Sequence, residues 1–154
     1  MESKCGVMNV RQLFIDLVRL ETELWDAVDQ RLRTEFDLPL GKFDVMQAIA
    51  RIESCRVYDI ARELSITVGA ASKGVDRVEA TGHCVRRPNP DDRRSSIVEL
   101  TPAGESLLAE ATVVVDGELD IRLGTALPKQ ELERLGATIA ALRTAGARAD
   151  AERR

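Results

Sequence analysis

Basic side chains gather in the middle of the chain, where their types and spacing suit the neutralisation of phosphate groups. The stretch from Lys73 to Val98 holds six basic and four acidic residues, although the whole chain of 154 residues has a formal net charge of −4. The basic residues are Lys73, Arg77, Arg86, Arg87, Arg93 and Arg94. Proteins that bind nucleic acid normally present such residues to the phosphates. The segregation of charge therefore favours a polyanion-binding region within an otherwise acidic chain.

Residue patterns for catalysis or metal binding do not stand out. The single histidine, His83, lies in a predicted strand, and the sequence has no P-loop, G-x-G-x-x-G or H-E-x-x-H motif. Cys5, Cys55 and Cys84 are odd in number and widely spaced, which argues against a disulfide framework and a cysteine-rich zinc site. We expect no enzyme activity, no cofactor and no metal site.

The length suits a single domain over residues 1–154. No stretch approaches the roughly 18 apolar residues of a membrane helix, and the first ten residues, MESKCGVMNV, do not form a signal peptide. We expect a cytoplasmic protein with no membrane partner.

Apolar residues at steps of three and four predict a long amphipathic helix from Val10 to Leu32. Asp37-Leu38-Pro39 ends it, and a shorter helix is expected from Leu40 to Ile52. The stripe of the first helix is Val10, Leu13, Leu17, Leu20, Leu24, Val28 and Leu32.

The next segment predicts two short helices joined by Ser65-Ile66-Thr67, a helix-turn-helix. The first helix begins near Val57, and Thr67 is the expected N-cap of the second, which runs to about Thr81. Ser65 occupies a turn position where glycine is common, so we expect some backbone strain there.

A hairpin and two further helices follow. His83–Arg87 and Ser95–Leu100 are predicted strands joined by a turn. Thr101-Pro102 begins a helix that is expected to continue to Leu123. Pro128 begins the last helix, and the tail from Ala145 to Arg154 is expected to fray.

The predicted fold is mainly α with a small two-stranded β wing, a winged helix-turn-helix flanked by long terminal helices. We expect a DNA-binding lobe over residues 40–100 and a helical dimerisation lobe over residues 9–35 and 101–148. The terminal helices carry apolar stripes that a small central lobe could not cover, which favours a homodimer.

The segment from Asp92 to Gly104, DRRSSIVELTPAG, resembles the D-x-R, apolar strand, L-T-x-x-G signature of the MarR (multiple-antibiotic-resistance regulator) family. Ile60 to Leu64 (IAREL) and Val75 to Gly82 (VDRVEATG) resemble the helix-turn-helix of that family. With the flanking helices, the resemblance covers about residues 10 to 145. It implies a transcriptional regulator that binds double-stranded DNA.

In a winged helix-turn-helix the second helix enters the major groove and the wing reaches the minor groove. The candidate DNA-binding residues are Thr67, Val68, Ser72, Lys73, Arg77, Arg93 and Arg94. Asp92 is expected to orient Arg94 through a bidentate carboxylate–guanidinium pair, as the resemblance also implies. A solvated charged loop is the alternative for the wing.

Gly69, Ala70 and Gly74 give the predicted recognition helix a run of small residues. They either permit a close approach of the backbone to DNA or mark a weakly specified helix that only tertiary packing holds. The sequence favours neither.

A small anionic or phenolic effector is expected where the two lobes meet. Asp44 and Arg51, with Arg77, resemble positions used by urate-responsive members of the family, and Trp25 could line the same pocket. The alternatives are a surface ion pair for Asp44 and Arg51, and ordinary packing for Trp25.

The favoured function is a ligand-responsive repressor that binds a pseudo-palindromic operator as a homodimer. One alternative is a winged-helix module that binds protein without sequence-specific DNA binding. Another is a redox-responsive regulator that uses Cys5, because some relatives in the resembled family sense oxidants through a cysteine near the first helix.

Overall fold

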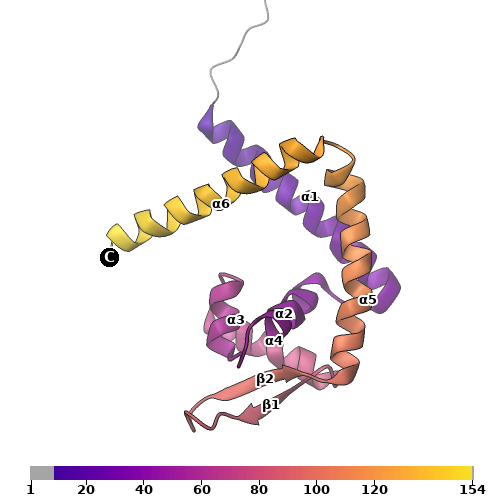
Figure 1. The fold of residues 1–154 in the computed structure, drawn as a ribbon, viewed down its shortest axis with the longest axis vertical. Helices are drawn as coiled ribbons and strands as arrows, with labels where there is room; N and C mark the ends of the chain where they lie inside the picture. The colour runs from indigo at the N-terminus through magenta and orange to yellow at the C-terminus, as the bar shows by residue number, and fades with distance from the viewer. Residues whose placement is uncertain (1–8, 154) are drawn as a thin grey trace, which may run out of the picture. The chain divides into compact units, whose positions relative to one another are not determined.

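A computed structural model describes residues 9–153 of the protein. Its elements are α1 (Val10–Phe36), α2 (Leu40–Arg51), α3 (Val57–Glu63), α4 (Val68–Ala80), β1 (Cys84–Pro88), β2 (Ser96–Leu100), α5 (Pro102–Leu119), the π-helical turn η1 (Asp120–Gly124) and α6 (Lys129–Glu152) (Figure 1). The prediction of a mainly helical fold with a two-stranded wing is confirmed. The chain forms two compact units, Met1–Asp116 and Gly117–Arg154.

The junction between α1 and α2 begins the first unit. Asp37 ends α1 in the left-handed conformation, with φ of 52°. The Leu40 backbone N–H then donates to Asp29 Oδ1 at 2.8 Å, so a side chain from α1 caps the first turn of α2. This bond fixes the start of α2 against α1.

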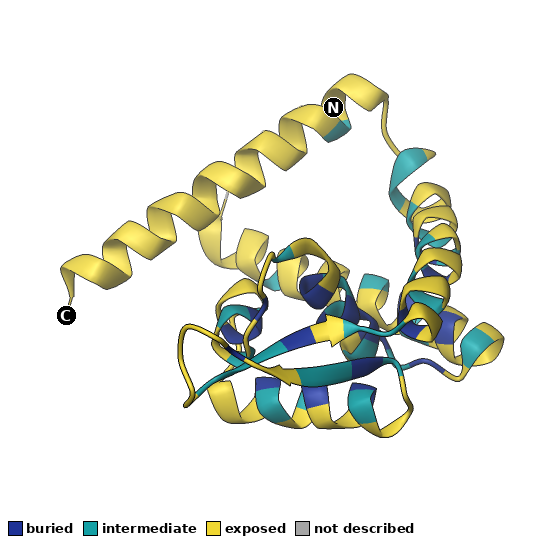
Figure 2. Ribbon diagram, turned by 60° about the horizontal axis from the view of Figure 1, so that its bottom comes forward, coloured by how far each residue is buried: buried dark blue, intermediate teal, exposed yellow. Residues whose placement is uncertain are grey.

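The core of the first unit lies between α2, α3, α4 and the hairpin. Figure 2 shows the dark-blue buried residues concentrated on these elements. The most deeply buried side chains include Leu32, Leu38, Met46, Ile60, Val75, Val78 and Val98. Burial of such apolar surface, at about 25 cal/mol per Å², is the main force that holds the short helices together.

The helix-turn-helix forms at the predicted residues. Ser65 adopts φ of 54°, as expected for a position that favours glycine. The Ile66 N–H donates to the Ala61 carbonyl at 3.0 Å, and Thr67 Oγ1 accepts from the Ala70 N–H at 3.1 Å. The turn and the N-cap together set the direction of α4.

The hairpin, hereafter the wing (Cys84–Leu100), pairs β1 and β2 antiparallel, with Cys84 opposite Leu100 and Pro88 opposite Ser96. Both strands start one residue later than predicted, which leaves His83 outside β1. The Val98 N–H donates to the Cys55 carbonyl at 2.7 Å. The segment before α3 is therefore bonded to the outer side of β2.

Hydrogen bonds hold the start of α5 next to the chain that leads into the wing. Thr101 Oγ1 caps the helix by accepting from the Gly104 N–H at 3.1 Å and donates to the Gly82 carbonyl at 2.6 Å. A Cβ atom at position 104 would lie 2.0 Å from the His83 carbonyl oxygen. Glycine therefore stands in the L-T-x-x-G segment because the helix crosses the chain too closely for a side chain.

The second unit differs from the prediction at both ends. The helix expected to reach Leu123 changes to η1 at Asp120, where the Thr125 N–H donates to the Asp120 carbonyl at 2.9 Å. The tail expected to fray from Ala145 instead stays helical to Glu152. Alanine at alternate positions of this tail is the strongest helix former, which accounts for the longer helix.

None of the helices within residues 9–153 is long and apolar enough to cross a lipid bilayer.

Candidate nucleic-acid interface

The predicted recognition helix is α4, and it has one buried and one open face. Ala71, Val75 and Val78 are fully buried against the core. Thr67, Val68, Lys73 and Arg77 are exposed, and Ser72 is half-buried. Thr67, Val68, Ser72 and Lys73 therefore lie at the N-cap and in the first two turns, where a major groove could reach them, and Arg77 lies about one turn further along α4.

The two glycines of α4 have different surroundings. A Cβ atom at Gly74 would lie 2.9 Å from Val45 Cγ2 of α2, whereas one at Gly69 would meet nothing within 4 Å. At Gly74 the small size serves close packing of α2 on α4, so the interpretation as a DNA approach is wrong for this residue. Gly69 is exposed on the outer face and stays a candidate for that role.

A cluster of charges joins the wing to α4. Arg86 Nη2 lies 2.6 Å from Asp76 Oδ1, and Arg86 Nη1 donates to Glu79 Oε2. The Arg86 backbone N–H also donates to Glu79 Oε1 at 3.2 Å. With its side chain only 26% exposed, Arg86 works as a clamp between strand β1 and the recognition helix.

This clamp was missed by the sequence reasoning, which treated Arg86 only as part of the basic stretch. Asp76 and Glu79 lie three residues apart, so they share one face of a helix. This spacing could have indicated a site for a basic side chain, but only the fold shows that Arg86 of β1 occupies it.

Arg87 is also paired in the wing base, the paired strands Cys84–Pro88 and Ser96–Leu100. Its Nε lies 2.5 Å from Glu99 Oε2 across the two strands. Both side chains are more than half exposed, so this pair is a weak surface bridge. Both arginines of β1 therefore have a carboxylate partner within the domain, but the Arg86 side chain is largely buried and that of Arg87 is exposed.

The wing tip, residues 89–95, is a turn ordered by its own side chains. Asn89 is nearly buried, accepts from the Asp91 N–H at 3.0 Å and donates to Ser95 Oγ at 2.9 Å. Asp92 Oδ1 accepts from the Arg94 backbone N–H at 2.9 Å. The expected carboxylate–guanidinium pair between Asp92 and Arg94 is wrong for this structure, because the carboxylate instead closes a local turn through the backbone.

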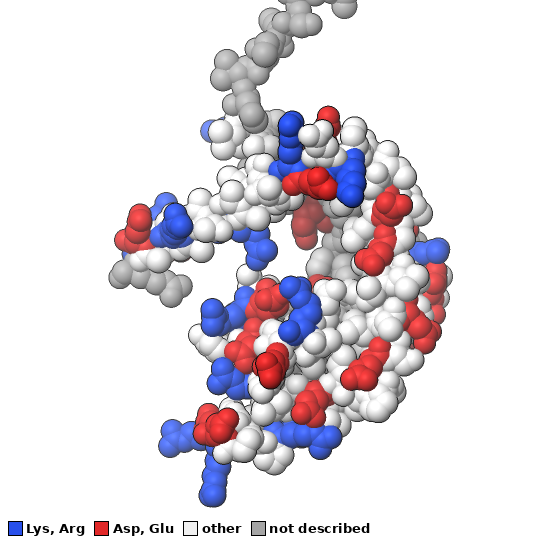
Figure 3. Space-filling model, in the orientation of Figure 1, with Lys and Arg blue, Asp and Glu red and all other residues white. Residues whose placement is uncertain are grey.

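Arg93 and Arg94 are exposed, and within residues 9–153 neither has a side-chain ion pair. In Figure 3, basic side chains project at the lower left, where the wing tip lies in Figure 1. The tip therefore presents two guanidinium groups on an ordered turn.

Trp25 and Arg77 line one pocket of about 690 Å³ between α1, α2 and α4. Its charged lining residues are Asp29, Arg33, Lys42 and Arg77. Lys42 Nζ donates to Thr81 Oγ1 at 2.5 Å, and burial lowers the pKa of this lysine although Cys84 and Asp37 act to raise it. The pocket thus carries an excess of positive charge.

Asp44 and Arg51 do not line this pocket. Arg51 Nη1 lies 3.4 Å from Glu63 Oε1, so Arg51 does form a surface ion pair, but with Glu63 and not with Asp44. Asp44 is half-buried, and burial raises its pKa. The structure therefore does not bring Trp25, Asp44 and Arg51 together.

Cys55 and Cys84 are free thiols with 1% exposure, and burial raises the pKa of each to about 11. Cys84 is part of the core of the first unit. Cys5 lies outside the described residues. No group of three potential metal ligands occurs in the described part of the chain.

A helix-turn-helix followed by a two-stranded hairpin defines the class: this is a winged helix-turn-helix domain. Residues 38–96 match the sequence model of the MarR family. The predicted resemblance to the MarR family is therefore confirmed over residues 38–96.

Among curated proteins, the multiple antibiotic resistance protein MarR of Escherichia coli is 24% identical over 119 residues, 77% of this chain and 83% of that protein. MarR of Salmonella typhimurium is 26% identical over 91 residues, and the match spans 63% of its length. A relative from Bacillus cereus, 26% identical over 99 residues, 64% of this chain and 65% of that protein, is named as an HTH-type transcriptional regulator.

Two solved structures share the fold. A MarR-family transcriptional regulator from Streptomyces coelicolor in complex with DNA has a TM-score of 0.80 at 18% identity, covering 92% of this chain and 91% of that one. CouR from Rhodococcus jostii, bound to p-coumaroyl-CoA, has a TM-score of 0.76 at 21% identity, covering 84% and 90%.

Proposed function

We propose that this protein is a transcriptional regulator that binds a pseudo-palindromic DNA operator as a homodimer and represses transcription. The observation that carries the proposal is the combination of an exposed polar face on α4 with two unpaired arginines on an ordered wing tip. A helix in the major groove and a basic tip in the minor groove are the contacts of this class. The S. coelicolor neighbour was solved on DNA.

Selection of bound fragments from random DNA, followed by gel-shift titration at two salt concentrations, tests this function. The Lys73→Ala protein should lose affinity for the selected operator and discriminate less against a base change, since Lys73 lies on the outer face of α4. Lys129→Ala, in the second unit, is the matched control and should bind like the parent. Failure of the parent to retard any DNA at low salt would refute DNA binding, because phosphate contacts alone give nonspecific affinity.

Two exposed apolar stripes support the homodimer. In α1 the first part of the predicted stripe is open, with exposures of 76% at Val10, 42% at Leu13 and 41% at Leu17, whereas Val28 and Leu32 are buried. In α6, Leu135, Ile139 and Leu142 are exposed. Surface of this kind is normally covered by another helix.

Light scattering on the purified protein tests the dimer. Leu17→Glu should yield a monomer, because a carboxylate would be buried in the interface. Arg19→Glu changes an exposed polar position of the same helix and should stay dimeric. A parent protein that is monomeric at micromolar concentration would refute the assembly.

A small anionic or phenolic effector fits the Trp25 pocket. Arg33, Lys42 and Arg77 supply positive charge there, and the indole of Trp25 supplies an apolar wall. Because α4 forms one wall, an occupant would affect the recognition helix and change operator affinity. Salicylate is a suitable probe: it should quench Trp25 fluorescence and release operator from the parent, and Lys42→Met should weaken both effects. The tryptophan is the only one in the chain, so the signal has one source.

A further inference from the structure

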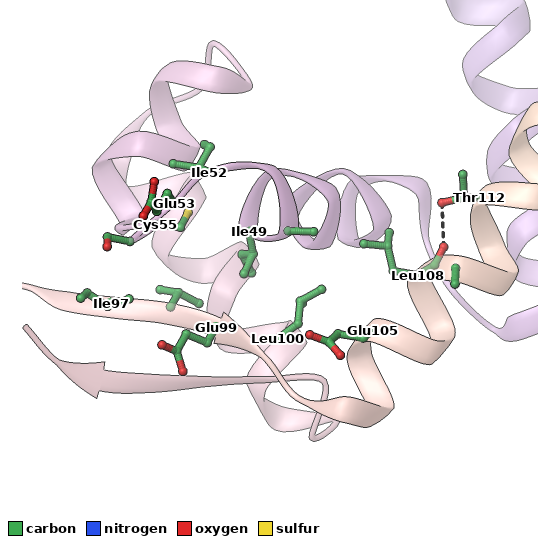
Figure 4. A pocket seen from close by; sticks show the side chains of 14 residues that line it. Ile49, Ile52, Glu53, Cys55, Ile97, Glu99, Leu100, Glu105, Leu108 and Thr112 are labelled. Atoms are coloured by element: carbon green, nitrogen blue, oxygen red, sulfur yellow. Dashed lines mark hydrogen bonds between the residues drawn. The ribbon is translucent and has the colours of Figure 1, made fainter.

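A second cavity, of about 850 Å³, lies on another side of the first unit. It is partly open to solvent and is lined by the C-terminal end of α2, the segment that follows it, strand β2 and the first turns of α5 (Figure 4). All of its lining residues fall between Ile49 and Thr112. Its volume is in the range of about 300–1,000 Å³ that is usual for small-molecule sites.

Aliphatic side chains form the walls of this cavity. Ile49 and Ile52 come from the end of α2, Ile97 and Leu100 from β2, and Leu108 from α5. Figure 4 shows them facing one another across the opening. Such walls would remove the apolar body of a ligand from water, at about 25 cal/mol per Å² of buried surface.

All charged lining residues are acidic. They are Glu53, Glu99 and Glu105, and the lining contains no lysine, arginine or histidine. Glu99 is held by Arg87, whereas Glu53 and Glu105 have no ion pair within the described residues. In Figure 4, Glu105 lies beside Leu100 and Glu53 lies at the other end, near Ile52. Two unpaired carboxylates therefore flank an apolar chamber.

We propose that this cavity binds an organic monocation with an aromatic or branched alkyl body. The aliphatic walls take the body, and the carboxylates of Glu53 and Glu105 attract the positive charge while they repel anions. The Trp25 pocket has the opposite charge, so the two cavities select ligands of opposite sign. Binding at this site does not depend on DNA recognition, and an assay without DNA tests it separately from the proposed function.

Tetraphenylphosphonium and tetraphenylborate provide the test, because they have nearly the same size and shape and opposite charges. Calorimetric titration of the full chain should show binding of the phosphonium ion. The double variant Glu53→Gln/Glu105→Gln should weaken this binding about tenfold, the effect of two partly exposed charges. Glu110→Gln, five residues further along α5 and outside the lining, is the matched control and should bind as the parent does.

A variant with a side chain that fills the cavity tests whether phosphonium binds there. Ala109→Trp places an indole in the chamber from an exposed position of α5 and should abolish phosphonium binding, with an unchanged circular dichroism spectrum and thermal midpoint. Tetraphenylborate binding, if present in the parent, should be unaffected by this change. The proposal is overturned if the parent does not bind phosphonium, if the double glutamine variant binds it as tightly as the parent, or if the filled variant retains binding. Where the filled variant does not fold, the double glutamine variant and its Glu110→Gln control decide alone.

Discussion

The wing has arginines at both ends, and their surroundings differ. In the wing base, Arg86 is clamped by Asp76 and Glu79, and Arg87 is paired with Glu99. At the wing tip, Arg93 and Arg94 are exposed, and the nearest carboxylate, Asp92, binds backbone instead of a guanidinium. On one short hairpin, the arginines of the base thus hold the wing in place, and those of the tip remain available to a polyanion.

The comparison also shows why formal charge is a poor guide to an interface. The central stretch carries six basic residues, but two of them are neutralised by neighbours within the domain. The tip is ordered by neutral and backbone hydrogen bonds at Asn89 and Asp92, which leave its guanidinium groups unpaired. The same residue type therefore serves structure at the base, whereas at the tip it stays unpaired where we propose the contact with DNA.

The largest difference between base and tip should appear in thiol reactivity. Burial, with a contribution from Glu79, raises the pKa of Cys84 to about 11, so its thiolate is scarce at pH 8. In a Cys5→Ser protein, iodoacetamide should leave Cys55 and Cys84 unlabelled until denaturant is added. Adding Arg93→Cys at the tip should give one site that reacts about 100-fold faster or more, measured by mass spectrometry. Rapid native labelling of Cys84 would contradict the view of the base as closed.

Removal of the clamp should cost the most stability. Arg86→Ala leaves two carboxylates on one face of α4 without their partner, and hydrogen bonds to charged groups contribute about 1.5–3 kcal/mol. We expect the free energy of unfolding to fall by about 2 kcal/mol in urea titrations. Arg87→Ala, which removes only an exposed pair, is the control and should change it by less than about 1 kcal/mol. Equal losses in the two variants would remove the distinction between clamp and surface bridge.

A substitution of an arginine at the wing tip should change DNA binding and leave the stability of the protein unchanged. Arg94→Ala is expected to weaken operator binding about tenfold and to lower the salt slope by about one unit, with unchanged stability. Arg87→Ala again serves as the control, because its guanidinium is held by Glu99. An Arg94→Ala protein with parental affinity would show that the wing tip does not contact DNA.

The smallest effect is expected from Asp92. Asp92→Ala removes the acceptor of the Arg94 N–H and loosens the turn, which should weaken operator binding about threefold through lost preorganisation. Asp92→Asn keeps an oxygen at the same place and should restore most of the affinity. If Asn and Ala weaken binding equally, the charge of Asp92 matters and the hydrogen bond does not.

The sequence predicted most of the fold because its signals are local. The Thr67 and Thr101 caps, the left-handed turn at Ser65 and the break at Asp37 each depend on residues within a few positions. The predicted C-terminal ends of α1 and α6 lie several residues before the observed ones, because residues with good helix propensity continue beyond the last residue of the apolar stripe. The outward set on α4 was also found from helical periodicity.

What the chain determined by itself is the order of elements, the face of α4 that points outward and the presence of a basic wing. Only the tertiary structure decided which arginines are free, that Gly74 serves helix packing, that Asp29 caps α2, and that Trp25 shares a pocket with Arg77 and not with Asp44 or Arg51. Each of these is a contact between segments distant in sequence. Periodicity and capping act within one turn of chain, whereas the partner of a charge or the wall of a cavity depends on how separate helices and strands pack.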